Sequence, residues 1–170
     1  MLAFFSNWLR GDVYKEQRTG VEFPEAIDGY KRGKVAPYEA EPGKKGVTIE
    51  YGARDAEVTI YIRVLGDEAH KTSADFLKDS IAGVKELETQ GKYTNVKFYQ
   101  FGADKERPGW KTAAFTSNST NHFLTSFIFC KVIPEHLVKI RATTGNPKIE
   151  SLLSFTKRLQ EIMDKEPRKP

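Results

Sequence analysis

The sequence predicts an α+β fold in which helices cover a largely antiparallel β-sheet. Three observations support this prediction: strand-like segments that alternate apolar and polar residues, two amphipathic segments with capping signals, and one long segment that is apolar on both faces. Short connections rich in turn-forming residues join the strand-like segments, and such connections produce hairpins, whose strands are antiparallel.

The first strand-like segments precede residue 65. Residues 30–38 form a weak candidate strand, and Pro37, which has no amide donor, suits an edge or a strand end. Residues 47–51 and 58–64 alternate apolar with mostly polar positions, and a period of two places each set on one face of a strand. The connection at 52–55 is short enough to make these two strands a hairpin.

An amphipathic helix is predicted to follow. The hydroxyl of Thr72 or Ser73 can accept a hydrogen bond from an unpaired amide at its start, and Asp75 places negative charge at the positive end of the helix dipole. Gly91 is expected to end the helix, because glycine readily adopts a positive φ. Apolar residues recur between these signals at helical spacing: Phe76, Leu77, Ile81, Val84 and Leu87.

Four more strands are predicted, at residues 96–101, 110–116, 121–132 and 137–143. The third of them is apolar on both faces, which is typical of a central strand covered from both sides. One of its faces carries Leu124, Ile128, Cys130 and Val132, and the other carries Phe123, Phe127 and Phe129. We therefore expect a layer of helix on each face of the sheet.

The last predicted element is a helix with Asn146 as its cap and Pro147 at its first position, where the fixed φ of proline is already helical. Pro167 is expected to end it. The predicted buried stripe consists of Ile149, Leu152, Leu153, Thr156, Leu159 and Met163. We accordingly expect residues 1–18 to flank the domain, residues 19–166 to form it, and residues 167–170 to be a C-terminal tail.

Composition excludes several classes of protein. The net charge is +4, but the cations mostly alternate with acidic residues, as in Lys78-Asp79 and Lys85-Glu86, so we expect a mixed-charge surface and no nucleic-acid partner. No segment approaches the roughly 20 apolar residues of a membrane-spanning helix. Residues 1–9 are apolar but lack the features of a signal peptide. They are expected to pack on the domain or to be disordered, and the alternative is weak contact with a membrane surface.

Several motifs resemble a group of uncharacterised bacterial proteins. The motifs are Thr19-Gly20-Val21-Glu22-Phe23-Pro24, Gly29-Tyr30-Lys31-Arg32, the paired strands at 46–51 and 56–62, and Lys139-Ile140-Arg141-Ala142-Thr143. The order of elements resembles the PsbP-like α/β/α sandwich superfamily, which includes the DcrB-like envelope proteins. The resemblance implies a non-enzymatic scaffold or binding module. Many of the bacterial relatives are exported, although this chain shows no intact export signal.

Chemistry-bearing residues are few. Cys130 is the single cysteine, and a thiol enzyme would need it near His122 or His136. Its apolar neighbours in the sequence predict a buried small hydrophobe instead. Asp67, Glu68 and His70 lack the spacing of a metal site. We therefore predict no catalytic residues, no metal and no cofactor.

The predicted site for a partner is the loop that connects two strands at residues 102–110. Its charged residues are adaptable, and Trp110 would supply apolar area if it is exposed. Arg107 and Trp110 are the predicted contacts. An alternative polar rim is the hydroxyl-rich turn at 116–122, which should lie at the opposite end of the intervening strand. The sequence therefore predicts a non-catalytic binding or assembly module with a protein partner. The alternative is a thiol-dependent hydrolase or another enzyme that uses Cys130 with His122 or His136.

Overall fold

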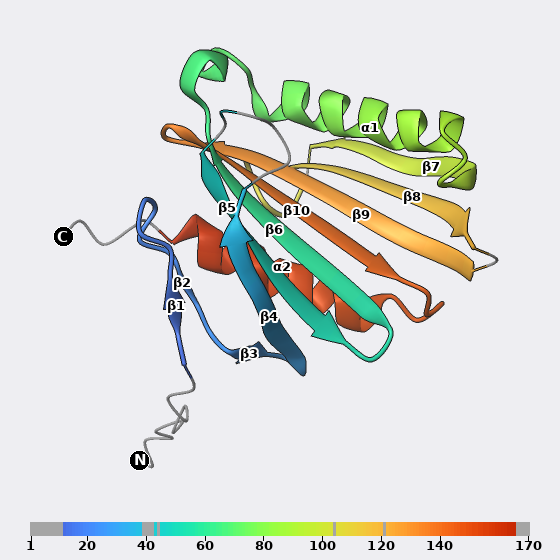
Figure 1. The fold of residues 1–170 in the computed structure, drawn as a ribbon, viewed down its shortest axis with the longest axis horizontal. Coiled ribbons are helices and arrows are strands. Elements are labelled where there is room, and N and C mark those ends of the chain that lie inside the picture. The colour runs from blue at the N-terminus through green and yellow to red at the C-terminus, as the bar shows by residue number, and fades with distance from the viewer. Residues whose placement is uncertain (1–11, 39–42, 44, 104, 121, 166–170) are drawn as a thin grey trace.

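The computed structural model describes residues 12–38, 43, 45–103, 105–120 and 122–165, apart from the side chains of residues 100 and 101. The predicted apolar segment at residues 1–9, the helix end at Pro167 and the tail at 167–170 lie outside these ranges. Eight antiparallel strands form the main sheet, in the order β3-β4-β5-β6-β10-β9-β8-β7. The antiparallel sheet and two helices expected from the sequence are confirmed (Figure 1).

Within each half of the sheet, consecutive strands pair as hairpins. The first half of the sheet contains β3 (Ala26–Ile27), β4 (Tyr30–Pro37), β5 (Gly46–Ala53) and β6 (Ala56–Val64). The second half contains β7 (Thr94–Ala103), β8 (Lys111–Ser119), β9 (His122–Ile133) and β10 (His136–Thr144). β10 pairs with β6 and joins the two halves. A small separate sheet consists of β1 (Tyr14–Lys15) and β2 (Glu22–Phe23), which the sequence analysis did not predict.

The first helix, α1 (Ser73–Thr89), begins and ends at the predicted signals. Thr72 is the N-cap, and its hydroxyl and the carboxylate of Asp75 each accept a hydrogen bond from the other residue's amide, which is a capping box. At the other end the amides of Gly91 and Lys92 donate to the carbonyls of Glu88 and Leu87. Gly91 has φ of 72°, which completes a Schellman motif.

The second helix, α2 (Glu150–Asp164), begins later than predicted. The side chain of Asn146 accepts a hydrogen bond from the amide of Lys148, and this turn precedes the helix instead of capping it. The predicted stripe was also partly wrong, because Leu153 is 36% exposed and Phe155 is fully buried. Phe155 follows Leu152 by three residues and precedes Leu159 by four, the spacing that keeps all three on one face, whereas Leu153 lies outside it.

The two helices pack on opposite faces of the sheet, each over its own core (Figure 1). α2 packs through Leu152, Phe155, Leu159 and Met163 against the core that contains Ile60, Phe129 and Ile140. α1 packs through Phe76, Leu77 and Val84 against the core that contains Phe115, Ile128 and Cys130. β9 contributes alternate side chains to both cores, as its two apolar faces predicted.

Coverage of the sheet by α1 is uneven. Within the described residues, its contacts are mainly with β7, β8 and β9. The same face of β6 and β10 extends beyond the helix (Figure 1). A groove therefore lies where the side of α1 meets these two strands.

Candidate functional site

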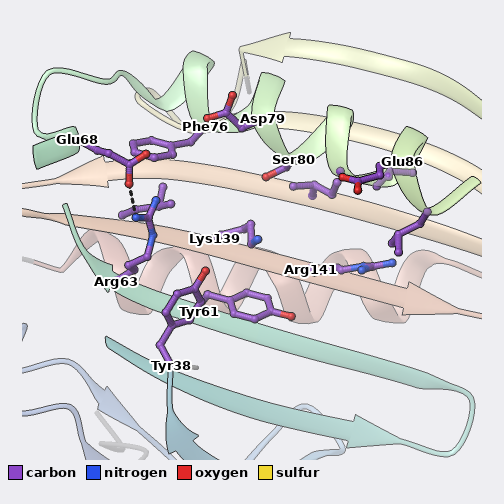
Figure 2. A pocket seen from close by; sticks show the side chains of 15 residues that line it. Tyr38, Tyr61, Arg63, Glu68, Phe76, Asp79, Ser80, Glu86, Lys139 and Arg141 are labelled. Carbon is purple, nitrogen blue, oxygen red and sulfur yellow. Dashed lines mark hydrogen bonds and ion pairs between the residues drawn. The ribbon is translucent and has the colours of Figure 1, made fainter. Parts of the chain in front are cut away.

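The groove beside α1 has a volume of about 620 Å³ and is the candidate site. This volume is typical of small-molecule sites, which combine apolar walls with a few convergent polar groups. Figure 2 shows its composition: the strands supply a floor, and α1 supplies one wall. The short helix η1 (Gly66–Glu68) and Tyr38, which follows β4, lie at one end of the groove.

Three cations line the floor: Arg63 on β6, and Lys139 and Arg141 on β10. Their neighbours Ile62 and Ile140 belong to the core beneath α2. Because successive side chains of a strand point to opposite faces, the cations lie on the face toward α1. Lys139 is paired with Tyr61 in the register of β6 and β10, so a tyrosine and a lysine are adjacent at the centre of the floor.

Arg63 is held in place by a charge network at one end of the groove. Its guanidinium donates to the carboxylate of Glu68, which also accepts from Lys71 at 2.7 Å. Both cations lie over the ring of Phe76, at 5.3 and 5.4 Å from its centroid. Arg63 is buried, and a buried guanidinium requires such a partner. We therefore assign Arg63 a structural role in the groove.

The two cations of β10 contact aromatic rings instead. The ammonium of Lys139 lies 4.6 Å from the ring centroid of Tyr61. The guanidinium of Arg141 lies 5.7 Å from the ring centroid of Tyr93 and donates a hydrogen bond to its hydroxyl. Both side chains are half-buried. The two tyrosine rings therefore orient the two cations on the floor.

The wall from α1 contains a gap. Phe76, Ser80, Val84 and Leu87 face the groove, but Gly83 has no side chain, and a Cβ added there would have nothing within 4 Å. The acidic residues of the wall lie toward solvent. Asp79 is 57% exposed and accepts a hydrogen bond from Lys71, and Glu86 is exposed and accepts from Gln90. The groove is consequently basic at its floor and acidic at its rim.

Trp110 is buried in the structure, whereas its predicted role in partner binding required it to be exposed. Its ring is 0% exposed in the core beneath α2, and its indole N–H donates to Asp164 at 2.9 Å. Arg107 is also turned inward, and its guanidinium donates a hydrogen bond to Glu161 at 2.9 Å. Both residues therefore fasten the β7–β8 connection to α2. Their contact with a partner stays a prediction.

Other aromatic residues of the same sheet region divide between core and surface. Phe115 is fully buried and Tyr99 is 65% exposed, with its hydroxyl 3.0 Å from that of Thr116. The side chain of Phe101 is outside the described part of the chain. The hydroxyl-rich turn predicted at 116–122 is shorter than expected, because residues 116–119 belong to β8 and His122 begins β9. The connection lies at the opposite end of β8 from Trp110, as expected, and its Asn121 is outside the described residues.

Cys130 does not form a pair with either histidine. His122 is eight positions away along β9, roughly 26 Å at the rise of a strand. His136 is three positions before Lys139, the residue opposite Cys130, so its side chain points to the other face of the sheet. Burial raises the pKa of the Cys130 thiol to about 11, which disfavours a thiolate. The geometry therefore does not support the alternative of a thiol-dependent hydrolase.

The loop before α1 is tied together by its own side chains. Glu68 binds Arg63 and Lys71, and the imidazole Nδ1 of His70 lies 3.1 Å from the carbonyl of Asp67.

Among the residues that the structure describes, no group of three or more His, Cys, Asp or Glu side chains could hold a metal ion. In the same residues, no helix has the length and apolar character needed to cross a membrane.

Comparison with known proteins gives little further information. No protein-family model and no curated protein matches the chain. Among solved structures, PA94 from Pseudomonas aeruginosa, a protein of unknown function, is similar at 13% sequence identity and a TM-score of 0.38. The alignment covers 93% of this chain and 96% of that chain.

The groove was not predicted from the sequence, although part of its signal is visible there. Lys139 and Arg141 alternate with Val138 and Ile140, and a pair of cations on one face of an otherwise apolar strand marks a polar surface. The sequence did not reveal that α1 would lie beside Lys139 and Arg141 without covering them, and so leave a groove there. That information depends on where the helix lies across the sheet.

Proposed function

We propose that this chain is a non-catalytic binding module whose ligand site is the groove between α1 and strands β6 and β10. The observation that carries the proposal is a cavity of about 620 Å³ with aromatic side chains and convergent polar groups on its floor. Such a combination is the usual sign of a small-molecule site. Membership of the PsbP-like superfamily is part of the same proposal, and its support is the set of sequence motifs.

The geometry of the only cysteine supports the absence of catalysis in this proposal. Cys130 is buried, its pKa is raised, and its sulfur lies 4.0 Å from the hydroxyl oxygen of Ser80, which is not a base. A nucleophile requires a base within hydrogen-bond distance to remove its proton. The residues of the groove have instead the character of a recognition site, because their charges and rings hold one another in fixed positions.

The test uses a variant that fills the groove without removing any of its charges. In Gly83→Leu, the new side chain enters the open space of the α1 wall. Glycine is also a poor helix former, so the substitution should leave the fold at least as stable. We expect NMR titration of the protein with a library of small aromatic compounds to shift amide resonances of α1, β6 and β10, and we expect Gly83→Leu to abolish these shifts.

Gly83→Ala is the matched control, because a single methyl group leaves most of the groove open. The proposal is wrong if the library shifts resonances only elsewhere in the protein. It is also wrong if Gly83→Leu, with an unchanged or higher melting temperature, binds the same compounds as the native chain.

A further inference from the structure

We propose that the ligand of the groove is a small organic anion with an aromatic or other planar apolar group, and that Lys139 and Arg141 bind its negative charge. This inference depends on the proposed function, because it names the ligand class for the same site. The first step of the argument is position. The two cations are two residues apart on β10, so they lie on the same face, roughly 7 Å apart along the strand. One carboxylate, sulfonate or phosphate group between them could accept hydrogen bonds from both.

The second step is charge. Among the described residues, three carboxylates line the groove. Glu68 binds Arg63 and Lys71, Asp79 accepts from Lys71 toward solvent, and Glu86 is exposed at the rim and accepts from Gln90. Arg141 donates to the hydroxyl of Tyr93, a neutral group that does not cancel its charge. Arg141 therefore presents positive charge on the floor, beside the apolar walls of the groove. Such walls strengthen the attraction of an anion, because they exclude water.

The third step is the shape of the apolar part. Tyr61 is at the centre of the floor and makes an edge contact with Tyr38, with ring centroids 6.2 Å apart at 90°. Across the groove, α1 presents Val84 and the gap at Gly83. A planar ring could lie between Tyr61 and this gap while its anionic group reaches Lys139 and Arg141. The site consequently favours a molecule with both parts over a simple inorganic anion.

The experiment compares two probes of the same size and shape. 1-Naphthoate is an anion, and 1-naphthamide is its neutral counterpart, so the difference between them reports the charge alone. We expect naphthoate to bind at least about tenfold more tightly in NMR titrations, because a hydrogen bond to a charged group contributes more than a neutral one. Arg141→Gln and Lys139→Met should each remove most of this preference.

The control is Arg54→Gln, which removes the same charge from an exposed turn between β5 and β6. It should keep the full preference for naphthoate. If both probes shift the groove resonances with equal affinity, the groove binds ligands but the anionic class is wrong. If neither probe, nor any other compound, shifts these resonances, the proposed function itself fails. Melting temperatures of the variants near that of the native chain exclude unfolding as the cause of lost binding.

Discussion

The indole N–H of Trp110 donates a hydrogen bond to the carboxylate of Asp164 at 2.9 Å, which connects the start of β8 to the last turn of α2. The same carboxylate accepts a hydrogen bond from Lys131 at 2.6 Å and lies 4.0 Å from Arg107. Residues far apart in the sequence thus meet at one acidic group. Because this group is near the end of α2, it fixes the helix on the sheet.

We expect Trp110→Phe to lower the free energy of unfolding by about 1 kcal/mol or more. The variant keeps an aromatic ring in the core but loses the hydrogen bond to Asp164, and a typical hydrogen bond contributes about 1 kcal/mol. Urea denaturation measures the change. Leu153→Ala is the control, because Leu153 is on the exposed side of α2, the helix that carries Asp164. Its truncation should cost about 0.5 kcal/mol or less. Equal stabilities of Trp110→Phe and the native chain would contradict this role.

Two glycines of β5 are expected to respond differently to alanine. A Cβ on Gly46 would lie 2.2 Å from the carbonyl oxygen of Ile62, a backbone atom that cannot move away easily, whereas a Cβ on Gly52 has open space. We expect Gly46→Ala to destabilise the protein by about 1–3 kcal/mol, the usual cost of overpacking, and Gly52→Ala to be nearly neutral. Thermal denaturation of the two variants is the measurement. Similar melting temperatures for both would show that the sheet relaxes around the added methyl group.

The cap of α1 provides a third prediction. Thr72→Ala removes the hydroxyl that accepts from the amide of Asp75, and we expect a loss of about 1 kcal/mol in the free energy of unfolding. Thr72→Ser keeps the hydroxyl and should restore most of the stability. Urea denaturation at neutral pH compares the two variants. The assignment of the cap is wrong if serine and alanine are equally destabilising.

The same cap should make stability depend on acidity. Hydrogen bonds from the amide and hydroxyl of Thr72 hold the pKa of Asp75 below its ordinary value of 3.8. A carboxyl group whose pKa is lowered by folding stabilises the native state above its ordinary pKa, and this contribution is lost as the pH falls through the folded value. We therefore expect Asp75→Asn to reduce the loss of stability between pH 3.8 and more acidic conditions. Chemical denaturation over this pH range measures it, and a profile identical to that of the native chain would contradict the prediction.

The sequence predicted the elements better than it predicted their arrangement. Periodicity located the long strands because alternate side chains of a strand face opposite sides of the sheet. Capping signals located α1 because they act within four residues. The signal at Asn146 and Pro147 was misleading, since the same two residues also favour a turn. The groove and the burial of Trp110 depend on how the helices lie over the sheet, and local patterns do not contain that information.

Cys130 provides the last prediction, because its thiol is fully buried beneath α1. Burial raises its pKa from 9.0 to about 11. Each rise of one in the pKa lowers the thiolate fraction at neutral pH about tenfold, so this fraction should be about a hundredfold below that of an ordinary cysteine. We expect Ellman's reagent to react slowly with the folded protein and rapidly in guanidinium.

A raised pKa also implies that the stability due to the neutral thiol is complete below pH 9 and is lost as the pH rises toward 11. Cys130→Ala should therefore show a smaller loss of stability over that range, whereas Ser80→Ala, which keeps the thiol, should retain most of it. Rapid reaction of the folded protein at neutral pH would show that the thiol is accessible and ionised, and would reopen the case for a thiol enzyme.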